Sequence, residues 1–267
     1  MAEGVFSKLD ESLQKALEER KWTPTPVQEV TQNAISSGGD RLVIAPTGSG
    51  KTMAAMLPLL DRCLKQKWQG MSILYITPLR ALNRDVDRRL DEITSAVGLR
   101  LGLRHGDTTQ SERTKQVRNP PNVMITTPET FQLMFTGSKL RELLKSVKAV
   151  VIDEVHEMAD GERGWQLSVG ISRLESFIGR QVQKIGLSAT VGNPDQVAKW
   201  LSKDAEAINA VAPRSTELSV DAVIQLPEDE IGSLELAISP RAHATLRGLA
   251  DIVANKFPCL IFVNSRN

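Results

Sequence analysis

The 267-residue chain is 41% hydrophobic, which is enough for one large α/β domain with a buried core, or for one domain and part of another. Its 33 basic and 32 acidic side chains leave a formal charge of +1, which excludes a strongly polycationic arm. A local basic groove remains compatible with this balance, because a binding footprint depends on where the charges lie.

The cysteines and the lengths of the apolar runs indicate the cellular compartment. Cys63 and Cys259 belong to no CxxC or Cys/His cluster, so the spacing of a metal site is absent and a reducing compartment is indicated. The first residues lack the basic and apolar regions of a signal sequence, and no apolar run approaches membrane length. We therefore expect a soluble, cytoplasmic protein with no membrane partner.

The chain begins with two predicted helices. The first has Ser7 as its N-cap, and the second runs from Pro26 to about Ser36. Gln28, in the first turn of the second helix, carries an amide that both donates and accepts hydrogen bonds, as the edge of an adenine requires. Alone it would be a surface glutamine, but its place shortly before the next motif favours base recognition.

An apolar strand at residues 42–44 leads into the stretch APTGSGKT, residues 45–52, and a helix with an apolar face follows. Strand, glycine-rich loop and helix are the context of a phosphate-binding loop (P-loop), although its usual first glycine is Ala45. Lys51 supplies charge for the outer phosphates, and the Thr52 hydroxyl is a hard ligand for Mg²⁺. A turn that only caps a core helix is the alternative. The sequence favours a nucleoside triphosphate held by Thr47, Gly48, Ser49, Gly50, Lys51 and Thr52.

Strands and helices continue to alternate along the chain. Further strands are predicted at residues 72–77, 99–103, 123–126, 148–152, 182–187 and 207–211. This rhythm predicts an α/β fold with a mostly parallel sheet that helices cover on both faces. Polar clusters follow the strands, and in such sheets ligands bind at the carboxyl ends of the strands. The separate motifs are therefore expected to converge on one crevice.

The strand at residues 148–152 runs directly into the stretch DEVH, residues 153–156. Asp153 at this strand end can hold, together with Thr52, the Mg²⁺ that bridges the β- and γ-phosphates. Glu154 is placed to orient or deprotonate the attacking water, and His156 to link the γ-phosphate region to the next motif. The alternative is an acidic helix N-terminus beside a satisfied histidine.

A second group of motifs suits the backbone of a nucleic acid. Each places a turn or a helix start, with unpaired N–H groups, directly after a strand, and Arg80 adds charge. Plain turn chemistry explains each motif separately as well, but their common sheet edge favours a track for single-stranded nucleic acid. Ser188 and Thr190, at another strand end, would alone form a turn, but in the crevice they could pass the state of the phosphate to other parts of the protein. The candidate backbone contacts are Pro78, Arg80, Gly106, Asp107, Thr127 and Pro128.

The character of the chain changes near Pro213, where acidic residues, Pro227 and Gly232 interrupt the alternation. We expect residues 1–212 to form the ATP-binding domain and residues 213–238 to form a linker. A helix near residues 241–256 and a strand at 260–263 follow. They cannot form a core of their own, so residues 239–267 are expected to be the truncated beginning of a second domain.

In this order the motifs resemble those of the superfamily 2 DExH helicases. Over residues 20–212 the chain is most similar to the large helicase-related (Lhr) proteins of archaea and bacteria, through the DEVH form and the stretches RHGDTTQSER and RNPPNVMITTPET. The other motifs that carry the resemblance are Thr25-Pro26 with Gln28, APTGSGKT, TPLRAL at residues 77–82, Gly106-Asp107, Thr127-Pro128-Glu129 and Ser188-Ala189-Thr190.

The resemblance implies a RecA-like first motor lobe of an ATP-dependent helicase that moves 3′ to 5′ on single-stranded DNA or RNA. It assigns hydrolysis to Asp153 and Glu154, and coupling of ATP to strand movement to His156, Ser188 and Thr190. Arg163-Gly164 resembles an Arg-Gly feature that follows the DExH motif in related helicases.

The stretch at residues 260–266 resembles the start of a second motor lobe in the same polypeptide. The motif with the arginine fingers would come later, so we expect the chain alone to bind nucleotide and to hydrolyse it near background. A remodeller of protein partners and a nucleotide-switched binding module without turnover are the alternatives. The choice between DNA and RNA stays open, since no reader of the 2′-hydroxyl is evident.

Overall fold

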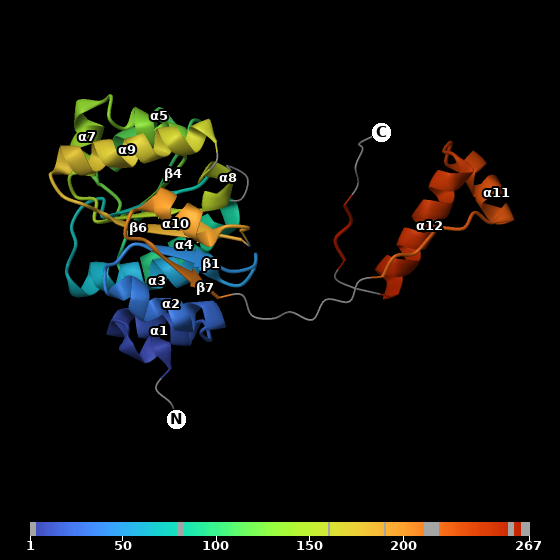
Figure 1. Cartoon of the computed structure of the whole chain (residues 1–267), viewed down its shortest axis with the longest axis horizontal. Coiled ribbons are helices and arrows are strands. Elements are labelled where there is room, and N and C mark those ends of the chain that lie inside the picture. Colours follow the sequence, from blue (N-terminus) through green and yellow to red (C-terminus); the bar gives the residue numbers. More distant parts are fainter. Residues whose placement is uncertain are drawn as a thin grey trace. The chain divides into compact units, whose positions relative to one another are not determined.

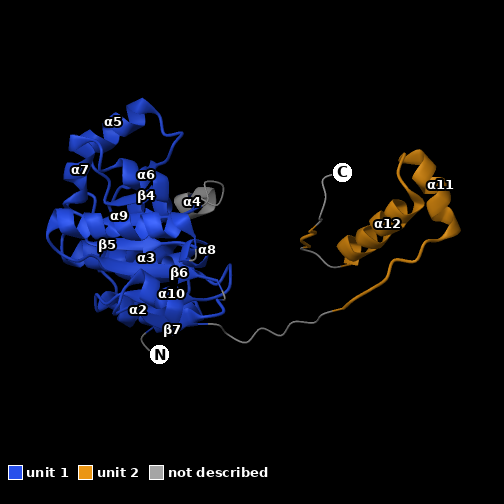
Figure 2. Cartoon of the chain, turned by 45° about the horizontal axis from the view of Figure 1, so that its top comes forward, with its two compact units in different colours: residues 1–213 blue, residues 214–267 orange. Residues whose placement is uncertain are grey.

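A computed structural model of the chain describes residues 4–78, 83–159, 161–189, 191–210, 219–255 and 259–262, apart from the side chains of residues 83–87. Arg80 and Thr190, two of the candidate site residues, lie outside the described residues. The chain divides into two compact units, residues 1–213 and 214–267 (Figure 2). Each unit is described by itself.

The first unit is built on a seven-stranded sheet with the strand order β3-β4-β2-β5-β6-β1-β7. Every neighbouring pair is parallel, which confirms the expected α/β class. The strands are β1 (Arg41–Ile44), β2 (Ile73–Ile76), β3 (Leu101–Arg104), β4 (Val123–Thr126), β5 (Ala149–Ile152), β6 (Gln183–Ser188) and β7 (Glu206–Asn209).

Helices cover both faces of this sheet (Figure 1). They are α1 (Glu11–Glu19), α2 (Pro26–Ser36), α3 (Lys51–Lys65), α4 (Asn83–Ala96), α5 (Gln110–Arg118), α6 (Pro128–Leu133), α7 (Ser138–Leu144), α8 (Val155–Ala159), α9 (Glu162–Ile178) and α10 (Pro194–Leu201). A short 3-10 turn, Val5–Lys8, precedes α1, whose N-cap is Asp10 rather than the expected Ser7. The Asp10 carboxylate accepts a hydrogen bond from the Ser12 backbone N–H at 3.0 Å, which identifies Asp10 as the cap.

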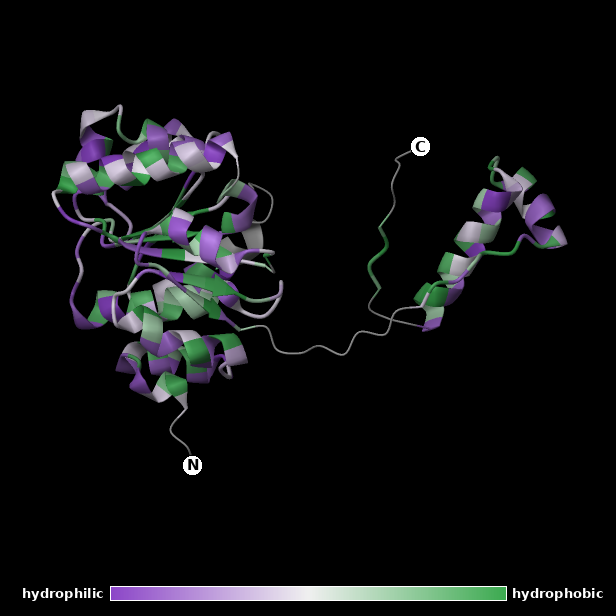
Figure 3. Cartoon of the chain, viewed as in Figure 1, coloured by the Kyte–Doolittle hydropathy of each residue, from purple (hydrophilic) through white to green (hydrophobic). Residues whose placement is uncertain are grey.

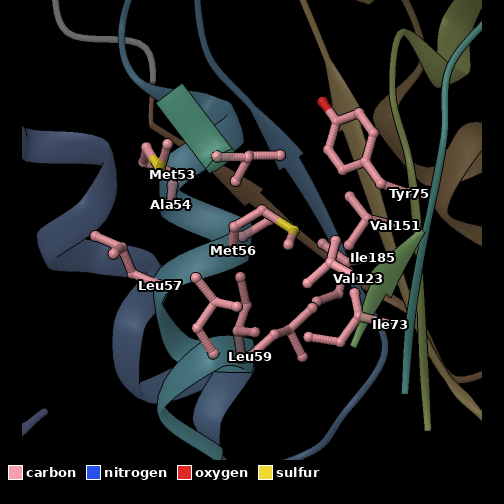
Figure 4. Packing of buried hydrophobic residues seen from close by; sticks show 14 of the residues in the cluster. Met53, Ala54, Met56, Leu57, Leu59, Ile73, Tyr75, Val123, Val151 and Ile185 are labelled. Atoms are coloured by element: carbon pink, nitrogen blue, oxygen red, sulfur yellow. The ribbon is translucent and has the colours of Figure 1, made fainter. Parts of the chain in front are cut away.

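Alternating strand residues divide the core into two clusters. Side chains of α1 to α4 pack with one set of strand residues, and side chains of α6 to α10 pack with the other set. In Figure 4, Met56 and Leu59 of α3 lie against Ile73, Val123 and Ile185. β2, β4, β5 and β6 are buried along their whole length, and β2, β4 and β5 have the mostly apolar sequences of strands in a parallel sheet covered on both sides.

The described residues of the second unit include two helices, α11 (Pro227–Glu235) and α12 (Pro240–Asn255). Asp229, which is fully buried, accepts hydrogen bonds from Arg247 at 3.0 Å and from the Leu226 backbone N–H at 2.8 Å, and it lies 2.7 Å from His243 Nδ1. The Arg247 guanidinium holds the pKa of this carboxyl well below its usual range. Figure 3 shows hydrophobic and hydrophilic residues alternating along both helices.

Two sequence expectations differ from the second unit. Residues 227–235, within the expected linker, are helical, because Pro227 at the first helical position and the acidic residues after it suit a helix N-terminus. Residues 259–262, where a strand was expected, have no regular structure. The assignment of residues 239–267 to a second lobe stays a prediction. In the described part of the chain, no helix combines the length and apolar character that a membrane crossing needs.

Candidate functional site

The expected motifs lie at the carboxyl ends of successive strands in one parallel sheet. The register pairs Ile44 with Ser188, and Ile76 with both Ile152 and Thr126, so that these strands end at the same level. The P-loop follows β1, DEVH follows β5, and the β6 end lies between them. Parallel topology therefore brings together motifs that are far apart in the sequence.

Backbone conformation favours glycine at two P-loop positions. Gly50 has a φ of +93°, and a Cβ there would also lie 2.8 Å from Gln28 Nε2, the end of a flexible side chain that can move. Gly48 has a φ of +76° but open space around it, so only its backbone conformation favours glycine. Ala45, which replaces the usual first glycine, is fully buried and donates its N–H to the Ser188 carbonyl at 3.1 Å. The loop is thereby fixed to the end of β6.

Lys51 begins α3 and folds back over the loop. Its Nζ donates a hydrogen bond to the Ala45 carbonyl at 2.8 Å, and the residue is only 7% exposed. Burial lowers the pKa of Lys51, and the charges of Glu154 and Asp153 partly offset this effect. The lysine and the acidic pair therefore act on one another across the strand ends.

Asp153 is held through both of its carboxylate oxygens. Oδ1 accepts a hydrogen bond from the Glu154 backbone N–H at 3.0 Å, and Oδ2 accepts one from the Tyr75 hydroxyl at 2.6 Å. Burial raises the pKa of Asp153, and hydrogen bonds and the Lys51 charge act in the opposite direction. Burial raises the pKa of the Tyr75 hydroxyl, and the nearby side chain of Thr52, in the first turn of α3, acts in the opposite direction.

Glu154 begins a chain of polar contacts to the end of β6. Its backbone has a φ of +45°, which is uncommon for a residue with a side chain. Its carboxylate lies 3.6 Å from His156 Nδ1, and that nitrogen lies 2.9 Å from the Ser188 hydroxyl. Burial raises the pKa of Glu154, and the charge of Asp153 raises it further.

Gln28 ties α2 to the P-loop. Its Oε1 accepts a hydrogen bond from the Thr25 backbone N–H at 3.1 Å, and its Nε2 donates one to the Gly50 carbonyl at 3.4 Å. Two hydroxyls beside the loop, Thr25 Oγ1 and Ser49 Oγ, are buried and have no hydrogen-bond partner among the described residues. Such polar atoms suit a polar ligand at this place, and the adenine role of Gln28 stays a prediction.

The second group of motifs occupies the ends of β2, β3 and β4. Thr127 caps α6 by accepting a hydrogen bond from the Thr130 backbone N–H at 3.3 Å, and Pro128 is the first helical residue. Asp107 donates its backbone N–H to His105 Nδ1 at 3.1 Å, directly beyond Gly106. Their contacts with nucleic acid stay predictions.

Arg163 joins two of these motifs. Its guanidinium forms an ion pair with Glu129 at 2.7 Å and lies 3.4 Å from the Pro78 carbonyl. Gly164, the next residue, leaves no room for a side chain, because a Cβ there would lie 1.9 Å from the Met158 carbonyl oxygen. The Arg-Gly pair therefore links α9, α8 and the end of β2.

Sequence reasoning missed Tyr75. The residue lies in the apolar strand β2 and looked like a core residue, although it is the only tyrosine of the chain. The one signal was the phenol itself, since the hydroxyl of a buried tyrosine usually has a polar partner.

The residues fit a magnesium ion that is shared with phosphates. Within the described ranges no group of three or more His, Cys, Asp or Glu side chains could form a metal cage. Mg²⁺ bound with substrate phosphates needs only one or two protein ligands with hard oxygens, which Thr52 and Asp153 offer.

A parallel sheet whose carboxyl edge combines a P-loop with an acidic pair defines a P-loop nucleotide-binding lobe. The sequence profile of the DEAD/DEAH box helicases matches residues 25–197, and the chain belongs to this family.

Within the family the chain is homologous to Lhr helicases. It is 38% identical over 259 residues to the "Lhr helicase/ probable uracil glycosylase" of Mycolicibacterium smegmatis, covering 91% of this chain and 17% of that protein. It is 34% identical over 266 residues to the "ATP-dependent helicase Lhr-Core" of Methanothermobacter thermautotrophicus, covering 91% of this chain and 30% of that protein. The chain thus spans less than a third of the length of these two relatives.

Solved structures agree with this grouping. The Mycobacterium smegmatis helicase Lhr bound to ssDNA and AMP-PNP superposes with a TM-score of 0.79 and 33% identity, over 98% of this chain and 35% of that chain. The helicase MrfA bound to DNA and AMPPNP superposes with a TM-score of 0.65 and 27% identity, over 75% and 29% of the two chains. The expected RecA-like helicase fold of the first unit is confirmed.

Proposed function

We propose that this chain is the ATP-binding motor lobe of an ATP-dependent DNA or RNA helicase, which couples ATP hydrolysis to 3′ to 5′ movement on single-stranded nucleic acid. One observation carries the proposal: the P-loop after β1 and the acidic pair Asp153 and Glu154 after β5 lie at the same carboxyl edge of one parallel sheet. The homology to Lhr helicases, one of which has been solved bound to ssDNA and AMP-PNP, supports the substrate class.

In this function residues 47–52 of the P-loop bind the phosphates of ATP, and Gln28 contacts the adenine. Lys51 exchanges the Ala45 carbonyl for the outer phosphates. Burial leaves its ammonium poorly solvated, which lowers the pKa of Lys51, and an anionic partner relieves this cost. Thr52 and Asp153 would hold Mg²⁺, which when bound neutralises charge on the β- and γ-phosphates.

Glu154 acts as the general base for the attacking water. Its raised pKa brings it closer to the operating pH, which favours proton acceptance. His156 lies between Glu154 and Ser188, so it can relay the phosphate state toward the nucleic-acid track, a coupling in which Thr190 also takes part. Pro78, Arg80, Gly106, Asp107, Thr127 and Pro128 contact the nucleic-acid backbone.

Nucleotide binding by the 267-residue chain tests the first part of the proposal. A fluorescent ATP analogue should bind the wild type, and Lys51→Ala should weaken binding at least about tenfold, or about 1.4 kcal/mol. Lys199→Ala, which removes an exposed lysine of α10, is the matched control and should bind like the wild type. Equal affinity of the wild type and Lys51→Ala would reject the P-loop assignment.

We propose that turnover requires a second motor lobe, in a polypeptide that carries both lobes. There Glu154→Gln should abolish nucleic-acid-stimulated ATPase and leave ATP binding intact. A nucleotide-switched module would instead show no stimulated ATPase even in the wild type. An unwinding assay on a bare forked duplex separates a helicase from a remodeller of protein partners.

Single-strand binding by the chain alone should be weak and sensitive to salt. Each phosphate contact contributes a slope of about −0.7 to the logarithm of the affinity against the logarithm of the salt concentration. Fluorescence anisotropy with a labelled single strand measures that slope, and binding that does not respond to salt would argue against a backbone track.

A further inference from the structure

Tyr75 is placed where its packing and its hydroxyl have separate roles. The residue is fully buried in β2, and its ring belongs to the core cluster that α3 covers. Figure 4 shows its hydroxyl at the rim of this cluster, pointing away from Ile73 and Val123. A phenylalanine would fill the same core space, so packing alone does not explain the hydroxyl.

The hydroxyl lies between two elements that carry different motifs. It donates a hydrogen bond to Asp153 Oδ2 at 2.6 Å, a short distance typical of a bond to a charged acceptor, and it interacts with the side chain of Thr52. Asp153 Oδ1 is occupied by the Glu154 backbone N–H. The carboxylate is thus fixed at both oxygens, and among the described residues the bond at Oδ2 is the one that comes from a side chain.

The register explains why a residue of β2 reaches this place. Tyr75 pairs with Val151 of the neighbouring strand β5, two residues before Asp153, and the Asp153 backbone N–H donates to the Ile76 carbonyl at 2.8 Å. The end of β5 is therefore bonded to β2 through its backbone and again through the Tyr75 side chain. This double attachment restricts the rotation of the Asp153 side chain.

We propose that Tyr75 is a positioning residue for the magnesium end of the site, which holds the Asp153 carboxylate beside Thr52 before nucleotide and metal bind. The inference rests on the proposed function, because it presumes that Thr52 and Asp153 are the protein's magnesium ligands. Partners that orient metal ligands typically contribute about 10–100-fold to metal affinity or activity.

The substitution Tyr75→Phe keeps the ring and removes the hydroxyl. Thr126→Val is the matched control, because Thr126 also ends a buried strand beside β2 and its Oγ1 has no hydrogen-bond partner in the described part of the chain. For the wild type and both variants, a fluorescent ATP analogue is titrated first in EDTA, and Mg²⁺ is then titrated at fixed nucleotide. Melting temperatures are recorded in parallel.

If Tyr75 positions Asp153, Tyr75→Phe should change the Mg²⁺ requirement and leave metal-free nucleotide affinity unchanged. Tyr75→Phe should bind the analogue in EDTA like the wild type and should need about 10–100-fold more Mg²⁺ for the metal-dependent gain in affinity. Thr126→Val should match the wild type in both titrations. An unchanged or lower Mg²⁺ requirement in Tyr75→Phe would overturn the proposal, as would an equal loss of binding with and without metal.

A double-mutant cycle with Asp153→Asn tests whether the hydroxyl acts through the aspartate. In the Asp153→Asn background, Tyr75→Phe should cause no further change in the Mg²⁺ requirement, and a full additional loss would contradict the role. If the wild type itself binds no nucleotide, the proposed function fails and this inference fails with it. If the wild type binds nucleotide but the hydroxyl has no effect on the metal, only the role of Tyr75 is rejected.

Discussion

Asp153 and Glu154 carry negative charge where the fold disfavours it. Burial is the largest cause of the raised pKa of each carboxyl, and the attraction of Lys51 only partly offsets it. Neighbouring acids at a sheet edge stabilise the molecule less than neutral side chains of the same shape would. The pair therefore represents stability given up for function, as is common at active sites.

The change Glu154→Gln should raise the melting temperature at pH 7. A carboxyl whose pKa is raised by folding is destabilising when ionised, so removing its charge should stabilise the chain and raise the melting temperature. As the pH falls through the raised pKa, the wild-type carboxyl becomes protonated and the advantage of the variant should disappear. Melting curves between pH 8 and pH 4 measure this difference. A gain that is constant over that range, or a loss at pH 7, would contradict the argument.

The junction of α8 and α9 depends on one residue without a side chain. Gly164, in the first turn of α9, lies against the Met158 carbonyl near the end of α8, and Arg163 beside it reaches Glu129 at the start of α6. Close approach of two helix ends fixes the direction in which Arg163 leaves its helix. The packing of α8 against α9 and the ion pair between Arg163 and Glu129 therefore depend on each other.

Gly164→Ala should disrupt this junction, whereas Gly161→Ala should be tolerated. A Cβ at residue 164 would lie 1.9 Å from the Met158 carbonyl oxygen, and a Cβ at residue 161 would lie 3.8 Å from the same atom. Overpacking of this kind costs about 1–3 kcal/mol or more, while replacing a helix N-cap glycine by alanine costs about 1 kcal/mol or less. Chemical denaturation of both variants measures the costs. Similar stability of the two variants would show that the junction moves to accept the methyl group.

At the scale of the whole molecule, the two compact units are stabilised by different kinds of interaction. The first unit has a sheet covered on both faces, whereas the helix pair of residues 227–255 depends on the contacts of Asp229 with Arg247, His243 and the Leu226 backbone. Loss of one carboxylate should therefore affect one unit only.

Asp229→Ala should release the helix pair and leave the sheet intact. Removing the carboxylate leaves the Arg247 guanidinium and the start of α11 without their common acceptor. Hydrogen exchange should become faster over residues 227–255, with unchanged protection of β2 and β5. Glu230→Ala, an exposed change in the same helical turn, is the control. Unchanged exchange in α11 and α12 would show that other contacts hold the pair.

Much of this architecture could be predicted from the sequence, because it depends on local patterns. The run at residues 149–152 and the motif after it identify a buried strand with an acidic end, and parallel topology then implies that the motifs converge. The strand order could not be predicted, since the place of β2 between β4 and β5 is a non-local pairing. Tyr75 was missed because an aromatic residue in a buried strand looks the same whether or not its hydroxyl has a partner. The acidic stretch after Pro227 suited a linker and a helix start equally well.

The largest consequence of the proposed function for the whole chain concerns turnover. If this chain is one lobe of a two-lobed motor, the arginine that stabilises the transition state comes from outside it, and such a group is worth about 10³–10⁵ in rate. The 267-residue chain should therefore bind ATP but hydrolyse it near background, without stimulation by single-stranded DNA or RNA. A phosphate-release assay on the chain and on the longer polypeptide measures the ratio. Robust nucleic-acid-stimulated turnover by the chain alone would mean that all the groups needed for hydrolysis lie within these residues, and the two-lobe proposal would then have to be abandoned.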